Sequence, residues 1–590
     1  MIRLARLGGL ARLGGLARLG GRARLGPWPL LAFLAVAFVV PVATVLSLAV
    51  WDPARGWNAA PVLRIATTPV YATVAARTLE IAAWTTALCV LGGFPIAALI
   101  HRLAGRPRLV VFLLVLLPFW TSFLVKTFAW MVLLGRNGTV NALIAALTGE
   151  PASASLLFNA GAVLVGMVHG LMPFAVLTIL PVLESIDPRL AHASASLGAR
   201  PSETFLRVTL PLAMPGIAAA GLIVFVTAVG FFIVPALLGG PRQTMVANLI
   251  IDMVQEMLNW PLAAAASAMM FAVVAAVFVG YVAVFGIGTL VGRGRAPSAR
   301  RGRPRAGRRA FWIAWDRVAD LLSGPTPVRR LAGPAGTAAT LALVAFLVLP
   351  TLFLVPVSFS RSGIVDWPPE LFSTKWYAAL DTPLWRSAAW RSATVATATG
   401  LLSLALALPA ATWFVRHAGR LRTPALVAMI APMVVPRIII AIGLFYLFAK
   451  LGIVGSWLGL VIGHTVIALP FVVTMLIAVV QAFDERIEQA AQVCGAGPAM
   501  RLRRVVLPLL APGLLSAFIF AFVTSLDELT IALFVTGGLG STLPKQMWDE
   551  ALLRVSPTLA AASTVVFVFM SVAVVLAQRL RERHAPQPTR

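Results

Sequence analysis

The sequence predicts an all-α integral membrane protein, on the evidence of its composition, its long apolar runs and the placement of its basic residues. Of the 590 residues, 59% are hydrophobic and only 12% are charged, and the mean hydropathy is +0.91. Soluble globular domains carry about 25% charged residues. A soluble fold of this composition could not keep so much apolar surface from water, so we expect the lipid bilayer to surround the chain.

The apolar residues gather in runs that fit membrane-spanning helices, which need about 20 apolar residues each. Twelve such runs divide into two sets of six, one in each half of the chain. The first set lies near 28–51, 78–101, 109–134, 156–183, 212–238 and 262–291, and the second near 332–358, 388–415, 423–449, 455–482, 509–535 and 558–578.

The basic residues predict the orientation of these spans. If the N-terminus is cytoplasmic, the cytoplasmic segments hold 34 of the 48 Lys and Arg residues. Lys and Arg in short loops favour the cytoplasmic side, whereas Asp and Glu have little effect. We therefore expect both termini to be cytoplasmic, and the net charge of +27 reflects membrane topology rather than nucleic-acid binding.

Composition also predicts the domain boundaries. The first residues repeat LARLGG three times, which indicates a disordered basic arm that is a passive tail or contacts anionic headgroups. An Arg- and Pro-rich stretch separates the two sets of spans. We expect a disordered arm at 1–27, a first six-helix half at 28–292, a cytoplasmic linker at 293–330, a second six-helix half at 331–580 and a cytoplasmic tail at 581–590.

The two halves share an internal repeat at an offset of 297 residues. Residues 186–216 correspond to residues 483–513, with Asp187 matching Asp484 and Pro215-Gly216 matching Pro512-Gly513. Each copy follows the fourth predicted span of its half, which indicates parallel halves related by an axis along the membrane normal. In each copy we expect a short helix rich in small residues, a glycine that ends it, and a Leu-Pro pair that begins the next span.

These loops resemble the EAA motif of ABC-importer permeases, EAA-x3-G-x9-I-x-L-P. The spacing from glycine to proline is matched in both loops, while His192 and Gln489 stand where the family has glutamate, and Val208 and Val505 replace the isoleucine. The resemblance implies that each loop forms a coupling helix that docks on an ATPase subunit. The residues it assigns to docking are His192, Ala193, Ser194, Gly198, Pro211, Gln489, Ala490, Ala491, Gly495 and Pro508.

The remainder of the chain is similar to permeases of the spermidine/putrescine importer group, with two permeases fused in one polypeptide. The similarity is carried by residues 118–130 and 231–240 in the first half and by residues 432–448 and 525–538 in the second. It implies the type I importer (MetI-like) fold in a bacterial inner membrane. It further implies three kinds of partner: ABC ATPase subunits as a homodimer, an extracytoplasmic solute-binding protein and a small-molecule substrate.

The chain itself shows no sign of catalysis. None of its four lysines follows a glycine, so a G-x-x-x-x-G-K-[ST] phosphate-binding loop is missing and ATP hydrolysis is expected in a separate subunit. Cys89 and Cys494 lie in unlike surroundings, and we expect no disulfide, metal or cofactor. The other classes considered are a transporter driven by an ion gradient, which the duplicated loops disfavour, and a membrane enzyme.

Four ionisable residues in the predicted spans are candidates for function, because charges in a membrane are costly. Lys126 and Arg437 are the cations, and Asp527 and Glu528 are the anions. In one interpretation the four pair internally and hold the halves together. In the other, an acid faces the substrate path and attracts a cation. The resemblance places Ser525, Asp527 and Glu528 along that path, and Trp120 and Phe231 are candidates to pack against a methylene chain or an ammonium group.

Arg437 complicates the choice of substrate. A guanidinium repels an amine and suits a carboxylate or phosphonate. Polyamine-like organic cations are the leading prediction, with ferric iron complexes and aminophosphonates or other organic anions as alternatives.

Overall fold

The computed structural model describes residues 26–52, 56–149, 155–286, 333–362, 372–417, 419–537, 540–553 and 556–584, with side chains to residue 572. Residues 1–25 of the expected arm, the whole expected linker and residues 585–590 of the expected tail lie outside these ranges, so predictions about them stay untested.

The first half is helical, apart from one short hairpin that the sequence did not predict. Trp51–Asp52 (β1) pairs antiparallel with Gly56–Trp57 (β2) directly after the first span. The helices are α2 (Trp28–Leu34), the π-helical segment Ala35–Val39, α3 (Val40–Ser47), α4 (Ala60–Thr67), α5 (Pro69–Arg102), α6 (Gly105–Trp120), α7 (Phe123–Leu134), α8 (Thr139–Thr148), α9 (Ala160–Glu184), α10 (Pro188–Ser196), α11 (Pro201–Thr204), the π-helical segment Phe205–Thr209, α12 (Leu210–Val229), α13 (Ile233–Leu238), the 3-10 turn Pro241–Gln243, α14 (Val246–Gln255) and α15 (Trp260–Phe285).

The second half has a similar order of long helices, although its described residues show no counterpart of α8 or of the hairpin. Its helices are α18 (Pro334–Val357), α19 (Lys375–Ala379), α20 (Pro383–Arg416), α21 (Arg422–Ile430), the 3-10 turn Ala431–Met433, α22 (Arg437–Leu451), α23 (Trp457–Ala482), α24 (Glu485–Val493), α25 (Pro498–Arg501), the π-helical segment Leu502–Val506, α26 (Leu507–Leu526), α27 (Thr530–Val535), α28 (Leu543–Leu553) and α29 (Pro557–His584).

Within the described ranges, ten helices are long and apolar enough to cross a membrane, or eleven if one bent pair counts as a single span. The bent pair is Arg422–Met433 with Arg437–Leu451, which meet at 89°. The last of the twelve predicted runs corresponds to α29, whose side chains are described only as far as Val572. The predicted class of all-helical membrane protein is confirmed.

Four predicted spans are wrong as continuous helices. The run 109–134 is broken between α6 and α7, 212–238 between α12 and α13, 423–449 between α21 and α22, and 509–535 between α26 and α27. At two of these breaks, 230–232 and 434–436, the residues are as apolar as the helices around them, so hydropathy alone gave no sign of the change. The other two breaks contain polar residues, Thr121-Ser122 and Asp527-Glu528, within runs that are otherwise apolar. The backbone there lies inside the protein rather than against lipid, where irregular structure is tolerated.

The repeat is reproduced in three dimensions at the same offset of 297 residues. The short helix, the π-helical segment, the long helix and the short helix after the break each begin 297 residues later in the second half. Gly198 and Gly495 both have φ of +84°, a left-handed conformation that suits glycine. Asp187 and Asp484 each accept a hydrogen bond, of 2.9 Å, from the backbone N–H two residues later. The predicted parallel duplication is therefore confirmed, down to the helix caps.

The Leu-Pro pairs begin α12 and α26, as expected, with Pro211 and Pro508 in the first turn of each helix. Each helix follows a π-helical segment without a break, which the sequence did not predict. The N–H of Leu210 bonds to the carbonyl of Phe205, five residues earlier, and that of Leu507 bonds to Leu502 in the same way. This wider turn accommodates a proline, which lacks an N–H and crowds the preceding turn of an α-helix.

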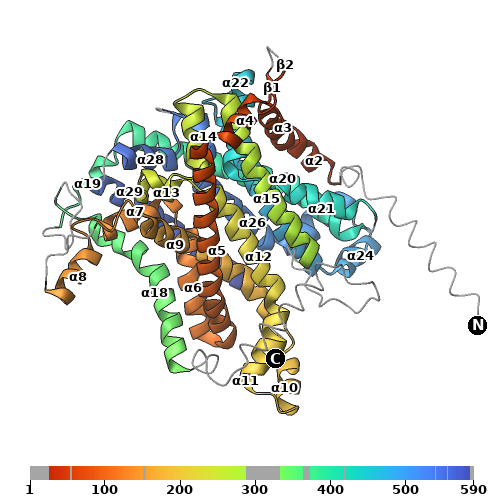
Figure 1. The fold of residues 1–590 in the computed structure, drawn as a ribbon. Coiled ribbons are helices and arrows are strands. Elements are labelled where there is room, and N and C mark those ends of the chain that lie inside the picture. Colours follow the sequence, from red (N-terminus) through yellow and green to blue (C-terminus); the bar gives the residue numbers. More distant parts are fainter. Residues whose placement is uncertain are drawn as a thin grey trace, which may run out of the picture.

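The halves exchange their first helices (Figure 1). In the first half α3 packs against α22, and α2 packs against α20 and α21, all of which belong to the second half. In return α18 packs against α5, α6 and α7. His169 contributes to this contact, because its Nε2 lies 3.0 Å from the carbonyl oxygen of Leu347 in α18.

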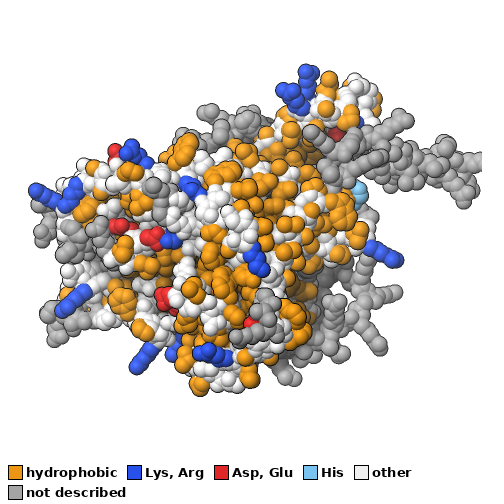
Figure 2. All heavy atoms as spheres, turned by 90° about the horizontal axis from the view of Figure 1, so that it is seen from above, with side chains coloured by type: hydrophobic (Ala, Val, Ile, Leu, Met, Phe, Trp, Pro, Cys, Tyr) orange, Lys and Arg blue, Asp and Glu red, His pale blue; other side chains and the backbone are white. Residues whose placement is uncertain are grey.

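The outer surface of the bundle is apolar, as a membrane requires. Figure 2 shows hydrophobic side chains across much of one face, with Lys and Arg mainly towards its edges. Along α5, Trp84, Leu88 and Leu91 are exposed, whereas their neighbours Cys89 and Gly92 are buried. This helical periodicity separates a lipid-facing stripe from a packed stripe.

Close packing of α9 against α12 gives a first testable prediction. A Cβ added to Gly216 would lie 2.8 Å from Val182, whereas one added to Gly221 in the same helix would meet nothing closer than 3.7 Å. We expect Gly216→Ala to lower the stability by about 1–3 kcal/mol, the usual cost of overpacking, and Gly221→Ala to leave it unchanged. Thermal unfolding of both purified variants in detergent checks this, and equal midpoints would contradict the close approach of Gly216 to Val182.

Candidate functional site

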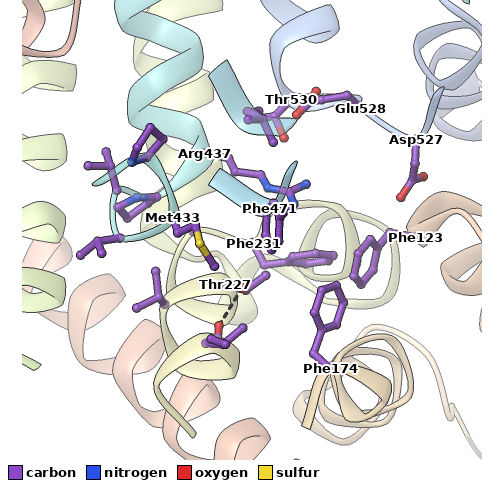
Figure 3. A pocket seen from close by; sticks show the side chains of 18 of the residues that line it. Phe123, Phe174, Thr227, Phe231, Met433, Arg437, Phe471, Asp527, Glu528 and Thr530 are labelled. Atoms are coloured by element: carbon purple, nitrogen blue, oxygen red, sulfur yellow. Dashed lines mark hydrogen bonds between the residues drawn. The ribbon is translucent and has the colours of Figure 1, made fainter. Parts of the chain in front are cut away.

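A cavity of about 130 Å³ lies between the halves (Figure 3). Its lining comes from the ends of helices at the four breaks, together with the middles of α9, α12 and α23. The residues that give it chemical character are Phe123, Phe174, Thr227, Phe231, Met433, Arg437, Phe471, Thr474, Asp527, Glu528 and Thr530.

The two acids lie at the break between α26 and α27. Asp527 caps the end of α26, and its carboxylate interacts with the hydroxyl of Ser122 and the backbone of Phe123, where α7 begins. Glu528 Oε2 accepts a hydrogen bond of 3.1 Å from the N–H of Ile531, in the first turn of α27. Each carboxylate therefore faces a helix N-terminus, whose free N–H groups and positive dipole end stabilise an anion.

Arg437 begins α22, directly after the 89° bend and next to Pro436. Its half-buried side chain points into the cavity from the second half, and Figure 3 shows it among the aromatic rings. The opposite half approaches closely here, because a Cβ on Gly230 would lie 2.9 Å from Pro436. The cavity is thus bounded by direct contact of the two halves.

Aromatic rings form the other side of the cavity. The rings of Phe123 and Phe231 meet edge to face with centroids 4.9 Å apart, and Phe123 stacks on Phe174 at 6.3 Å. Phe471 contributes from α23, at the position that matches Phe174 in the repeat. Such rings pack against methylene groups and attract ammonium groups through their faces.

Three of the residues predicted for the substrate path do not line this cavity. Lys126 is buried behind it, with Nζ 3.1 Å from the carbonyl oxygen of Pro118 and 3.9 Å from the centroid of Phe123. Trp120 packs edge to face on Phe520 with centroids 5.9 Å apart. Ser525 is buried within the second half and contacts His464 Nδ1 at 2.8 Å. Phe231, Arg437, Asp527 and Glu528 do line the cavity.

The four ionisable side chains are close enough to interact but form no direct pairs. Among the residues that the structure describes, none of the four has an ion pair within 4.0 Å. Asp527 interacts electrostatically with both Lys126 and Arg437, and Glu528 with Arg437. The expectation of direct internal pairing is therefore replaced by a looser arrangement that leaves space between opposite charges.

Sequence reasoning missed the aromatic residues Phe123, Phe174 and Phe471 as members of the site. A signal for two of them was present, because Pro173-Phe174 and Pro470-Phe471 correspond in the repeat. Phe123 directly follows Ser122, whose side chain caps α7 by accepting a bond of 3.3 Å from the N–H of Leu124. A serine at the start of an apolar segment is a helix-start signal.

The repeated loops form a second candidate site. None of the residues of α10 or α24 is buried, and large apolar side chains are exposed on or beside them. Leu197 is 89% exposed and Val493 is 88% exposed, while Leu190 and Ile487 match in the repeat and are both half-exposed. In Figure 1, α10 lies at the bottom of the molecule and α24 at its right. Paired apolar patches of this kind on a surface rich in charge are typical of docking sites.

The second of these helices is tied to the bundle by charge. Arg416, at the end of α20, lies 2.6 Å from Glu488 and 3.5 Å from Glu485 of α24. In the first half, Ser194 of α10 contacts Thr204 of α11 at 3.0 Å between hydroxyl oxygens. Each exposed helix thus has a defined position relative to the span next to it.

Comparison with known proteins agrees with a duplicated permease. The family model of the binding-protein-dependent transport system inner membrane component matches residues 13–296 and 403–585. The spermidine/putrescine transport system permease protein PotB of Haemophilus influenzae is 36% identical over 34% of this chain and 70% of its own length. The corresponding PotC of Escherichia coli is 31% identical over 40% of this chain and 90% of its own length.

A solved structure, described as a bacterial ABC transporter involved in the import of the acidic polysaccharide alginate, aligns with a TM-score of 0.35 and 16% identity. The alignment covers 45% of this chain and 99% of that chain.

The family model and the two permease relatives define a membrane subunit of a transport system. The chain belongs to the binding-protein-dependent transport system inner membrane component family. It is a multi-pass inner-membrane permease of an ABC importer, a transmembrane subunit rather than an enzyme, and it works with a binding protein and an ATPase.

Proposed function

We propose that this permease carries small organic solutes with an amino group, the class to which polyamines belong, through the cavity between its halves. The observation that carries this proposal is the pair of acids Asp527 and Glu528 at the cavity, opposite the rings of Phe123 and Phe231. Carboxylates attract an ammonium group, and rings suit the methylene groups next to it. The printed names of the PotB and PotC relatives support the same class.

The energy for transport enters, in this proposal, through the two repeated loops. α10 and α24 serve as coupling helices that dock on two ATPase subunits, which we propose to be a homodimer because the two helices match in length and cap. His192, Ala193, Ser194 and Gly198, and Gln489, Ala490, Ala491 and Gly495, form the contact surfaces. Pro211 and Pro508 do not contact the ATPase in this proposal; they favour the π-helical segments that precede them in the chain.

Membrane orientation follows from the same proposal. The coupling loops and both termini face the cytoplasm, and an extracytoplasmic binding protein delivers solute to the other side. In this proposal the hairpin lies on that outer side, with the exposed rings of Trp51 and Trp57 5.9 Å apart. Tryptophan is enriched at membrane–water boundaries, which agrees with this placement. We propose the two halves as residues 28–292 and 331–580, joined by a cytoplasmic linker.

The proposal predicts that Asp527→Asn lowers uptake of amines by about tenfold or more, because the loss of one charge-assisted contact costs roughly 1.4 kcal/mol or more. Uptake of radiolabelled putrescine and of 4-aminobutanoate would be measured in cells that express the complete transporter. Glu80→Gln is the control, since Glu80 is exposed on α5 and, among the described residues, forms an ion pair only with Arg77, 2.8 Å away.

Two outcomes would contradict the proposal. Unchanged uptake of both amines in Asp527→Asn would mean that the carboxylate does not serve the solute. Uptake that survives ATP depletion but stops when the proton gradient collapses would favour the ion-driven alternative. We expect uptake to stop when ATP is depleted and to continue when only the proton gradient is collapsed.

A further inference from the structure

The two sides of the cavity differ in chemistry although the halves are repeats. At the offset of 297, Phe231 corresponds to Glu528 and Gly230 to Asp527. Phe123 and Arg437 correspond as the first residues of α7 and α22. The first half therefore has two rings in contact where the second half has a guanidinium and a carboxylate. Charge is concentrated on one side only.

Arg437 interacts with Asp527 and Glu528 only through space. Within the described ranges, its guanidinium makes no hydrogen bond and no ion pair within 4.0 Å, and it lines the cavity half-buried. A guanidinium remains charged under all physiological conditions and carries five N–H donors in a planar fork. Leaving such a group in a confined space without an acceptor is costly, so the cavity favours a ligand that supplies one.

Glu528 has the opposite property, because its carboxylate has an acceptor oxygen that lacks a donor in the described part of the chain. Its side chain is 1% exposed, and Oε2 accepts a bond from the N–H of Ile531. The Thr530 side chain interacts with the carboxylate, but Oε1 has no hydrogen-bond partner within 3.5 Å among the described residues. Asp527 beside it is half-buried and lines the same cavity. The site thus offers acceptors for a cation and, beside them, donors for an anion.

We propose that the solute carries an acidic group together with its amino group, so that it is a zwitterion rather than a diamine. Arg437 binds the carboxylate or phosphonate, and Asp527 with Glu528 faces the ammonium group. This inference rests on the proposed function and narrows it to amino acids, aminophosphonates and similar compounds. The bidentate geometry of arginine with such acids makes Arg437 the residue that selects the solute.

Charge balance supports the same assignment. Two cations and two anions surround the site, because Lys126 interacts with Asp527 from behind Phe123. A zwitterion preserves this balance, whereas a diamine adds two positive charges beside Arg437. Uncompensated charge within a membrane protein is strongly disfavoured.

Binding to the full-length chain in lipid nanodiscs tests the inference with a matched pair of ligands. 4-Aminobutanoate and putrescine share the same length, but one has a carboxylate where the other has a second ammonium group. We expect radiolabelled 4-aminobutanoate to bind and putrescine to compete at least about tenfold more weakly, the factor that one charge-assisted contact provides. 3-Aminopropylphosphonate should compete as well as 4-aminobutanoate.

Variants of Arg437 complete the test. Arg437→Gln should lose about tenfold or more in 4-aminobutanoate binding and lose nothing for putrescine, while Arg437→Lys recovers part of the loss. The thermal unfolding midpoint of each variant shows whether weaker binding results from a loss of contacts or from a loss of the folded structure. Two results would contradict a zwitterionic solute: stronger binding of putrescine than of 4-aminobutanoate, or equal effects of Arg437→Gln on both ligands. Either result would still agree with the proposed transport of amines. Failure of both ligands to bind the wild-type chain would overturn the cavity as the solute site and the proposed function with it.

Discussion

Replacing both Gly198 and Gly495 with valine is expected to abolish ATP-driven uptake and to release the ATPase subunits from the membrane chain. Both glycines have φ of +84°, and a Cβ added to either would meet no atom within 4 Å. The effect of the substitution therefore comes from the backbone alone. Left-handed backbone costs a residue with a Cβ roughly 1–2 kcal/mol, and more for a β-branched side chain.

The chain can relieve this strain only by leaving the left-handed conformation. The exposed helices α10 and α24 would then change direction relative to the spans that follow them. Two such sites together lower the population of the native loop pair on the order of a hundredfold, since each 1.4 kcal/mol is a factor of ten. A partner that docks on both loops at once would lose most of its binding.

Co-purification of the ATPase with a tagged chain, together with ATP-dependent uptake, measures this effect. Gly497→Val is the matched control, because Gly497 lies two residues from Gly495 with φ of −65° and nothing within 4 Å of an added Cβ. Valine adopts that backbone without strain. Normal co-purification in the double variant, or an equal loss in Gly497→Val, would mean that these loops are not the docking elements.

Sequence alone predicted these loops well because their signals are local. Aspartate at the cap, small residues along the helix and glycine at its end each act through their own backbone, and the second copy repeats them at a constant offset. The class of protein was equally predictable, because the bilayer imposes long apolar runs and a bias in basic loops.

The cavity was harder to predict because its position depends on breaks within apolar runs. Residues 231–240 are almost wholly apolar, yet Phe231 and Phe232 interrupt the helix between α12 and α13. Hydropathy describes the preference for lipid and does not distinguish a helix from irregular backbone buried in protein. Tertiary packing decides where such a break occurs.

The orientation of Lys126 shows the same limit. The sequence placed this cation within a span, and a role in the substrate path followed naturally. In the structure Nζ turns to the carbonyl of Pro118, in the last turn of α6. Carbonyls there have no partner within the helix and carry the negative end of its dipole, so they attract a cation. The partner became apparent only once α6 was seen to end at Trp120.

The contact between α3 and α22 carries the second large prediction, because it joins the two halves backbone to backbone. A Cβ added to Gly443 in α22 would lie 3.0 Å from the carbonyl carbon and oxygen of Pro41 and 3.2 Å from the nitrogen of Val42. A flexible side chain could move aside, but a helix backbone cannot do so without displacing α3. Gly443→Leu is therefore expected to push the first helix away from the second half.

Displacement of α3 should affect solute binding as well as stability, since α22 begins at Arg437 and bounds the cavity. We expect Gly443→Leu to lower the free energy of unfolding by at least about 1–3 kcal/mol and to abolish binding of 4-aminobutanoate to the chain in nanodiscs. Ala449→Leu is the control, because Ala449 is exposed on the same helix and a larger side chain there meets open surroundings. If Gly443→Leu unfolds and binds like Ala449→Leu, the two halves are not held together by this contact, and the exchange of first helices does not position Arg437.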